Sequence, residues 1–136
     1  MKPRYMLDTN ICIYLMKNQP PQVRARFADC FVGDVVISAI TLAELAFGVA
    51  SSGEARANNQ VQLESLLEDI LVAPFDTAAA RTYGPLRAAY RARNKEALDK
   101  LIASHAISLG VTLVTNNEAD FRGFPGLAVE NWINAH

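Results

Sequence analysis

The sequence has 136 residues, of which 51% are hydrophobic and 20% charged, and its formal net charge is −1 at pH 7. This composition is typical of a water-soluble globular domain. No apolar run approaches the ~20 residues that span a bilayer, and Asp8 interrupts the only candidate hydrophobic region of a signal peptide. We therefore expect a single domain over residues 1–136, located in the cytoplasm and without membrane contact.

Short apolar segments of strand length alternate along the chain with segments of helical periodicity. The expected strands cover residues 4–7, 35–38, 70–73, 111–114 and, with a weaker pattern, 127–129. Between them, apolar residues recur at helical spacing in segments 20–31, 61–71 and 97–110. Strands this apolar have no face for water, so the pattern predicts a parallel sheet covered by helices on both sides.

Acidic residues lie near the ends of the expected strands, where parallel sheets bind their ligands. Asp8 follows the first strand, and Glu44 lies a short turn after the second. Asp99 begins the helix before the fourth strand, and Asp120 follows that strand. Each acid has a structural interpretation of its own, as a helix N-cap, as the glutamate of the capping box 41–44, or as a favourable charge at a helix N-terminus.

A metal site is the competing interpretation of these acids. Carboxylates that converge at one edge of a sheet repel one another unless a cation lies among them. Oxygen donors without histidine or cysteine partners suit Mg²⁺ or Mn²⁺. Such a site polarises a phosphate and activates a water molecule, as in metal-dependent nucleases and phosphatases. Spacing alone leaves both interpretations open, because it does not show whether the carboxylates meet.

Four segments of the chain read, in order, MLDTNICIYLM, ISAITLAELAFGV, LDKLIASHAISLGVTLVTNN and FPGLAVENW, and they span residues 6–132. Together they resemble the PIN-domain ribonucleases, and most of all the VapC-type toxins of bacterial toxin–antitoxin pairs. The resemblance implies a PIN-like three-layer α/β sandwich with a five-stranded parallel sheet in the order 3-2-1-4-5 and helices on both faces. It also implies an acidic pocket for Mg²⁺ or Mn²⁺ and hydrolysis of RNA.

The same resemblance implies the site residues. Asp8 matches the aspartate of the family's LDTN motif, Glu44 the glutamate of T-x-x-E-L, and Asp99 the aspartate of D-x-x-I-A-x-H-A. These three are the expected metal ligands, directly or through water. Many PIN domains have T-x-D after the fourth strand, and here the chain has an asparagine in place of that aspartate. Relatives that read TNN at this point commonly carry an acid just before a phenylalanine. Asp120, which precedes Phe121, fits that place as the fourth acid, with Glu118 as the alternative.

Uncharged neighbours are expected to support these acids. The hydroxyl of Thr9 is placed to hold the rotamer of the adjacent aspartate, and Asn10, Thr115 and Asn117 are similar candidates. One departure from the related toxins lies before the third acid, where the usual Pro-Ile-Gly is replaced by Asn-Lys-Glu. We favour a helix cap for Glu96 over an effect on the metal.

A basic segment lies between the third and fourth strands. Arg87, Arg91 and Lys95 are four residues apart, so a helix would present them on one face. The face is either simply solvated or a rail for RNA phosphates that leads toward the acids. Tyr83 and Tyr90 have a matching pair of interpretations, stacking on unpaired bases or packing within the protein.

Four further residues invite a chemical role but have a structural explanation. Cys12 and Cys30 do not form a CxxC pair, so we interpret them as buried thiols in a reducing compartment rather than a disulfide or a zinc site. His105 shares a helical stripe with leucines, which favours a packed histidine over a catalytic one. Asp76 follows an edge strand of the implied sheet, so we expect a helix cap.

These observations favour a Mg²⁺- or Mn²⁺-dependent endoribonuclease, the toxin of a toxin–antitoxin pair, that hydrolyses RNA with a metal-activated water. Two alternatives stay open. One is a PIN-fold module that binds RNA or protein without cutting, and the other is an aspartyl-phosphate enzyme with Asp8 as nucleophile. The second lacks the usual acid two residues later, where this chain has Asn10. The resemblance further implies a cognate antitoxin and a homodimer.

Overall fold

One parallel sheet organises the computed structural model, which describes residues 2–90 and 97–133. The strand order is β3-β2-β1-β4-β5, and every neighbouring pair is parallel. The predicted order 3-2-1-4-5 is therefore confirmed. Each expected strand agrees with the structure to within one residue, and the observed strands are β1 Tyr5–Leu7, β2 Val35–Ser38, β3 Leu71–Ala73, β4 Thr112–Val114 and β5 Ala128–Glu130.

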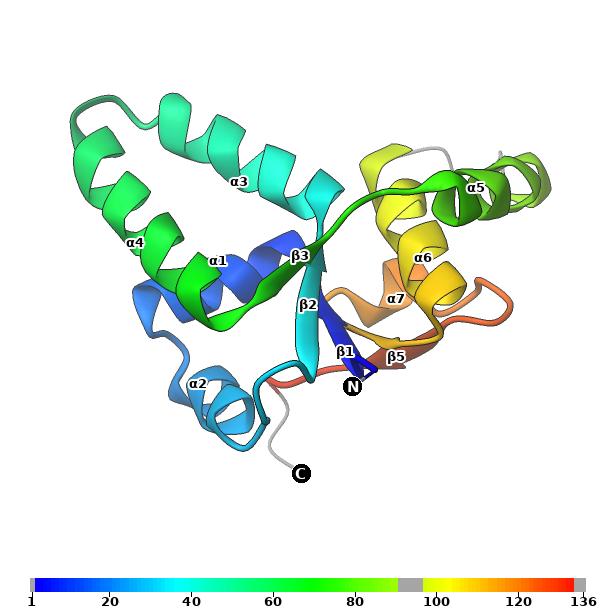
Figure 1. Cartoon of the computed structure of the whole chain (residues 1–136), viewed down its shortest axis with the longest axis horizontal. Coiled ribbons are helices and arrows are strands. Elements are labelled where there is room, and N and C mark those ends of the chain that lie inside the picture. Colours follow the sequence, from blue (N-terminus) through cyan, green and yellow to red (C-terminus); the bar gives the residue numbers. More distant parts are fainter. Residues whose placement is uncertain (1, 91–96, 134–136) are drawn as a thin grey trace.

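Helices cover both faces of the sheet, which makes three layers (Figure 1). One hydrophobic core lies between the sheet and α1 to α4, and a second lies between the sheet and α5 to α7. A short 3₁₀ helix, Gly53–Ala55, joins α3 to α4. The α-helices are α1 Thr9–Lys17, α2 Pro21–Ala28, α3 Ala39–Ala50, α4 Arg56–Asp69, α5 Thr77–Ala89, α6 Ala97–Leu109 and α7 Glu118–Phe121.

Neighbouring residues of the central strands enter different cores. In β1, Leu7 belongs to the core under α1, whereas Met6 belongs to the core under α6. In β4, Val114 and Leu113 divide in the same way. Side chains alternate between the two faces of a strand, and both faces here are covered. This explains why the central strands appear in the sequence as continuous apolar runs.

Two of the predicted helical segments extend beyond the ends of the observed helices. Helix α4 ends at Asp69, and Leu71 already belongs to the edge strand β3, where it is 62% exposed. Helix α2 ends at Ala28, and Phe31 lies beyond it with 76% of its surface exposed. The predicted stop at Gly110 is confirmed, because this glycine follows α6 directly with φ of +69°, a left-handed conformation that favours glycine.

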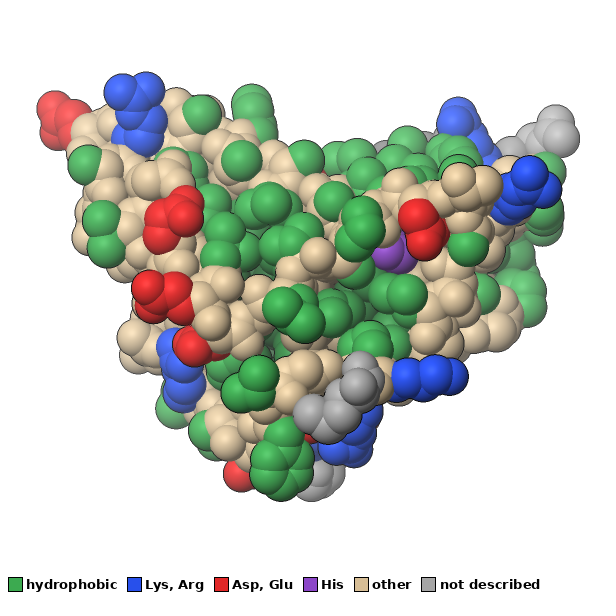
Figure 2. Space-filling model, viewed as in Figure 1, with side chains coloured by type: hydrophobic (Ala, Val, Ile, Leu, Met, Phe, Trp, Pro, Cys, Tyr) green, Lys and Arg blue, Asp and Glu red, His purple; other side chains and the backbone are tan. Residues whose placement is uncertain are grey.

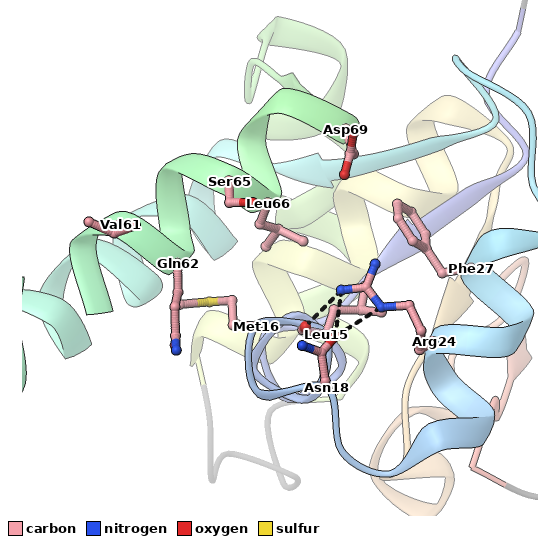
Figure 3. A pocket seen from close by; sticks show the side chains of 10 residues that line it. All are labelled: Leu15, Met16, Asn18, Arg24, Phe27, Val61, Gln62, Ser65, Leu66 and Asp69. Atoms are coloured by element: carbon pink, nitrogen blue, oxygen red, sulfur yellow. Dashed lines mark hydrogen bonds between the residues drawn. The ribbon is translucent and has the colours of Figure 1, made fainter. Parts of the chain in front are cut away.

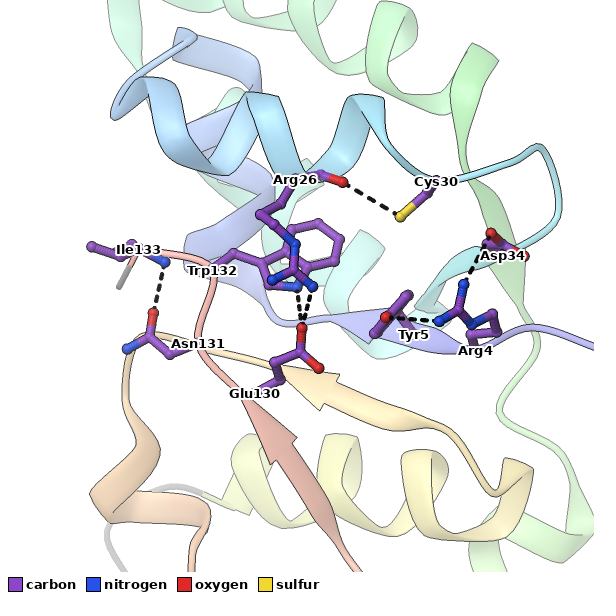
Figure 4. Close-up of polar contacts among 9 residues, drawn as sticks. All are labelled: Arg4, Tyr5, Arg26, Cys30, Asp34, Glu130, Asn131, Trp132 and Ile133. Carbon is purple, nitrogen blue, oxygen red and sulfur yellow. Dashed lines mark hydrogen bonds and ion pairs between the residues drawn. The ribbon is translucent and has the colours of Figure 1, made fainter. Parts of the chain in front are cut away.

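The segment after β5 is fastened to the layer that contains α2 (Figure 4). Glu130 Oε1 accepts hydrogen bonds from the Arg26 guanidinium and from Trp132 Nε1. The Arg26 guanidinium lies 5.5 Å from the centre of the Trp132 ring, and the Tyr5 ring meets that indole edge-to-face at 5.4 Å. Because Trp132 is fully buried, the segment FPGLAVENW, residues 124–132, has a structural role.

Figure 2 shows apolar side chains over the middle of one face of the molecule, between the α3–α4 arm and α5, with charged side chains toward the periphery. On α3, Phe47 is 74% exposed. Apolar surfaces of this kind commonly mark protein contacts.

Within the described ranges, no helix combines the length and the apolar character needed to cross a membrane.

Candidate active site

A cavity of about 350 Å³ opens at the carboxyl ends of β1 and β4, beside the point where the strand order reverses. This is where open α/β sheets bind ligands. All four acids that the sequence analysis proposed as metal ligands line it, although they come from separate parts of the chain. The lining residues are Asp8, Thr9, Asn10, Glu44, Asp99, Ile102, Asn117, Asp120 and Phe121.

Asp8 is both a helix cap and a residue of the cavity. Its Oδ1 accepts a hydrogen bond of 3.0 Å from the backbone N–H of Ile11, which caps α1. Its carboxyl group is buried and also bonds to the side chain of Thr115. Burial raises the pKa of Asp8, the nearby charge of Glu44 raises it further, and the hydrogen bonds oppose this rise. The predicted helix cap at Asp8 is therefore confirmed, and the same carboxyl group lies at the cavity where a metal ligand is expected.

The structure contradicts the capping-box interpretation of Glu44. Helix α3 begins directly after Ser38, whose Oγ caps it by accepting a hydrogen bond from Ile40 N–H. Thr41 therefore lies inside the helix. Glu44 instead accepts a hydrogen bond of 2.6 Å at Oε1 from the hydroxyl of Thr9. Thr9 was expected to hold the neighbouring aspartate, so the sequence analysis predicted the wrong partner. Thr9 is the first residue of α1, and the start of the helix turns its hydroxyl toward α3.

Thr115 has the role that was expected of Thr9. It bonds to the Asp8 carboxyl group, and its Oγ1 accepts a hydrogen bond of 2.9 Å from the backbone N–H of Asn117. The Asn117 side-chain amide in turn donates to Asp120 Oδ2 at 2.8 Å. A chain of hydrogen bonds therefore connects Asp8, after β1, with Asp120 in α7.

The geometry distinguishes the two candidates for the fourth acid. Asp120 lines the cavity. Both carboxylate oxygens of Glu118 are bound elsewhere, Oε1 by Asn131 at 3.0 Å and Oε2 by Arg122 at 3.1 Å, and Glu118 is not among the lining residues. We therefore retain Asp120 and set Glu118 aside.

The basic segment is described only in part. Arg91, Lys95 and Glu96 lie outside the described residues. Arg87 donates a hydrogen bond of 2.8 Å from Nη1 to the Tyr83 hydroxyl, and its guanidinium lies over that ring. On the same helix end, the ring of Tyr90 meets Phe124 edge-to-face at 5.1 Å. Both tyrosines therefore have partners within the protein.

The residues with expected structural roles agree with the structure, with one exception. Asp76 caps α5 by accepting a hydrogen bond of 3.0 Å from Ala79 N–H. Cys12 is buried and Cys30 is half-buried, so only the first is the buried thiol we expected. Both thiols are free, and burial raises the pKa of each. Neither is therefore an activated nucleophile.

The sequence analysis missed the apolar wall of the cavity, which consists of Ile102 and Phe121. A signal for the first was present, because Ile102 is one helical turn after Asp99 and therefore shares its face of α6. Phe121 directly follows Asp120 in α7, a helix that is too short to show periodicity in the sequence.

The donors around the cavity fit Mg²⁺ or Mn²⁺. Among the described residues, the lining offers carboxylate, amide and hydroxyl oxygens and contains no histidine or cysteine. The raised pKa of Asp8 marks a buried carboxyl group whose charge a cation would stabilise. Within the part of the chain that is described, no group of three or more His, Cys, Asp or Glu residues forms a preassembled metal site. The acids therefore surround the cavity rather than converge on one point.

A three-layer α/β sandwich with an acidic cavity at the switch point of its sheet defines the class of protein. A family model described as PIN domain matches residues 5–127. The chain is 40% identical over 131 residues to the tRNA(fMet)-specific endonuclease VapC of Shigella flexneri, covering 95% of this chain and 98% of the relative. It is 37% identical to ribonuclease VapC2 of Rickettsia felis, covering 94% and 97%. The chain belongs to the PIN-domain family, and within it to the VapC proteins.

Solved structures agree with this assignment. The DNA-bound VapBC of Salmonella typhimurium superimposes with a TM-score of 0.87 at 37% identity, covering 96% of this chain and 98% of that one. VapBC-5 of Mycobacterium tuberculosis, described as a member of the VapBC family of toxin–antitoxin systems, gives a TM-score of 0.64 at 27% identity, covering 95% and 98%.

Proposed function

We propose that this chain is a Mg²⁺- or Mn²⁺-dependent endoribonuclease that acts in the cytoplasm as the toxin of a toxin–antitoxin pair. The observation that carries the proposal is the single cavity lined by Asp8, Glu44, Asp99 and Asp120. The relatives named as VapC endonuclease and ribonuclease support RNA as the substrate.

In this proposal, Asp8, Glu44 and Asp99 hold the metal ion, directly or through water, and Asp120 completes the acidic set. A bound Mg²⁺ or Mn²⁺ supplies Lewis acidity, which polarises the scissile phosphate and lowers the pKa of the attacking water. Hydrolysis by water leaves a 5′-phosphate and a 3′-hydroxyl. The chain needs no nucleophile of its own, in keeping with the raised pKa of both of its free thiols.

The neighbouring side chains orient the acids. Thr9 fixes one carboxylate oxygen of Glu44, and Thr115 bonds to the carboxyl group of Asp8. The amide of Asn117 holds Asp120, and Asn10 is exposed at the cavity, where its amide is available to phosphate or water. Fixed ligand orientation matters because loss of such supports commonly costs 10- to 100-fold in metal affinity or activity.

The aspartyl-phosphate alternative is disfavoured. Asp8 is 6% exposed, its Oδ1 accepts a hydrogen bond from Ile11 N–H, and its carboxyl group also bonds to Thr115. A nucleophile needs an oxygen that is open to in-line attack on phosphorus, whereas a carboxylate oxygen that accepts one hydrogen bond still has a lone pair for a metal ion. The non-cutting alternative predicts lost ligands, whereas every acid of the expected set is present at the cavity.

An antitoxin segment is the partner we propose for two cavities beside the acids. The first, of about 200 Å³, shares Thr9 and Glu44 with the acidic cavity and is otherwise mainly apolar. The second, of about 270 Å³, shares Met16 and Gln62 with the first and lies among α1, α2 and α4 (Figure 3). A partner segment that follows them reaches the acids, where a basic side chain would be attracted.

The second of these cavities has a fixed cation in its wall. The Arg24 guanidinium donates two hydrogen bonds to Asn18 Oδ1 and a third to the carbonyl oxygen of Leu15 (Figure 3). This arrangement supports a partner with an acidic or carbonyl group at that point. We also propose a homodimer, to which the exposed Phe47 would offer apolar contact surface.

The decisive experiment is RNA cleavage by purified protein with and without divalent metal. We expect EDTA to stop cleavage and added Mg²⁺ or Mn²⁺ to restore it, with 5′-phosphate ends in the products. Sequencing of RNA ends after brief induction in cells will identify the target RNA. Cleavage that persists in excess EDTA would overturn the proposed metal dependence.

A further inference from the structure

A buried hydrogen bond joins the two helices that carry Glu44 and Asp99. His105 Nδ1 lies 2.8 Å from Ser38 Oγ, and both side chains are almost fully buried. Ser38 ends β2 and caps α3, which carries the glutamate. His105 lies in α6, whose first turn carries the aspartate. The contact therefore spans the gap between two walls of the acidic cavity, although it lies outside the cavity lining.

The surrounding groups determine which nitrogen of His105 carries the proton. The ring also bonds to the backbone of Pro74, which offers only a carbonyl acceptor. The nitrogen that faces Pro74 is therefore protonated, and Nδ1 accepts the hydrogen bond from the Ser38 hydroxyl. The oxygen of Ser38 accepts a further hydrogen bond of 3.0 Å from Ile40 N–H. One continuous chain of hydrogen bonds thus connects α6 with the first turn of α3.

Packing holds the ring in this orientation. Phe75 meets the imidazole edge-to-face at 5.3 Å. Burial lowers the pKa of His105, and the nearby charge of Asp76 and the bond to Pro74 oppose this effect. The neutral ring is the form that accepts from Ser38, so the lowered pKa and the hydrogen-bond pattern agree.

We propose that the His105–Ser38 pair is a positioning device that sets α3 against α6 and thereby holds Glu44 and Asp99 at the separation that the metal requires. The inference rests on the proposed metal-dependent cleavage. It applies to residues that touch neither metal nor RNA, so both are positioning residues rather than catalytic ones.

The test uses two substitutions that each keep one side of the imidazole. In His105→Asn, the amide oxygen replaces Nδ1 and accepts from Ser38, whereas His105→Gln retains only the group that faces Pro74. We expect His105→Gln and Ser38→Ala to lower kcat and Mn²⁺ affinity about 10- to 100-fold, with KM for RNA unchanged. His105→Asn should remain close to the wild type. The double variant Ser38→Ala/His105→Gln should lose no more than either single variant, because both changes break one bond.

Two controls separate this inference from a general loss of stability and from failure of the proposed function. Ile70→Val removes a methyl group from the core between the sheet and α1 to α4, a cluster that contains neither His105 nor Ser38. Its kcat should not change at a comparable loss of melting temperature. Mn²⁺ binding is followed by electron paramagnetic resonance, independently of cleavage. If the wild type cleaves but Ser38→Ala and His105→Gln match Ile70→Val, the inference is wrong. If the wild type neither binds Mn²⁺ nor cleaves, the proposed function itself fails.

Discussion

The hydroxyl of Thr9 donates a hydrogen bond of 2.6 Å to Glu44 Oε1, across a separation of 35 residues in the sequence. This bond joins the start of α1 to α3 at the edge of the acidic cavity. It leaves the second glutamate oxygen available for a metal ion or its water shell. We expect Thr9→Val to reduce cleavage about 10- to 100-fold, because the glutamate loses its orientation. Thr9→Ser retains the hydroxyl and should keep most activity, and equal rates in the two variants would contradict the role of the bond.

Asp8→Asn is expected to abolish cleavage while the fold persists. Asparagine caps helices about as well as aspartate, so α1 should not be destabilised. Asp76→Asn is the matched control, because Asp76 also caps a helix but lies outside the cavity. Its RNA cleavage should equal that of the wild type. Wild-type cleavage rates in a folded Asp8→Asn variant would overturn the assignment of the site.

The pKa of Asp8 makes a second, thermodynamic prediction for the same variant. Burial raises this pKa in the folded state above its ordinary value. A raised carboxyl pKa contributes stability below the unfolded pKa, and this contribution is lost as pH rises through the folded pKa. In EDTA at neutral pH, Asp8→Asn should therefore melt at or above the wild-type temperature. Added Mg²⁺ should raise the melting temperature of the wild type but not of the variant.

The two acids of α7 should respond differently to substitution. Asp120→Asn removes a charge from the cavity and should slow cleavage by about tenfold or more. Glu118→Gln loses only its ion pair with Arg122 on the surface, which costs at most about 1 kcal/mol of unfolding free energy. Its cleavage rate should be unchanged. A larger loss of activity in Glu118→Gln than in Asp120→Asn would reverse our assignment of the fourth acid.

Gly48 offers a selective test of the proposed binding of an antitoxin segment in the apolar cavity beside the acids. It lies in α3 and lines the apolar cavity beside the acids, and an added Cβ meets nothing within 4 Å. Gly48→Ala should stabilise the helix by about 1 kcal/mol and leave partner binding intact. Gly48→Trp fills this cavity, so we expect RNA cleavage to persist while inhibition by the cognate antitoxin weakens. Undiminished inhibition of Gly48→Trp would place the partner elsewhere on the surface.

Hydrophobic periodicity was enough to predict the layers of this fold. The strands β1, β2 and β4 are buried on both faces, so their residues form continuous apolar runs that are visible without a structure. Helix ends were predicted less well, because an apolar stripe does not show where a helix gives way to a strand. The residues Ile70 and Leu71 continued the stripe of α4, although the first is its C-cap and the second belongs to β3.

The resemblance to the PIN family singled out the acids that line the cavity, whereas their spacing in the sequence left open whether they meet. The partner of each polar side chain was decided only by tertiary contacts. Thr9 is adjacent to Asp8 in the chain but bonds to Glu44, and Thr115 takes the place beside the aspartate. His105 likewise lies on an apolar stripe, yet its hydrogen bond to Ser38 depends on how α6 packs against the end of β2. Such bonds depend on distances between distant segments, and a pattern of residue types does not contain them.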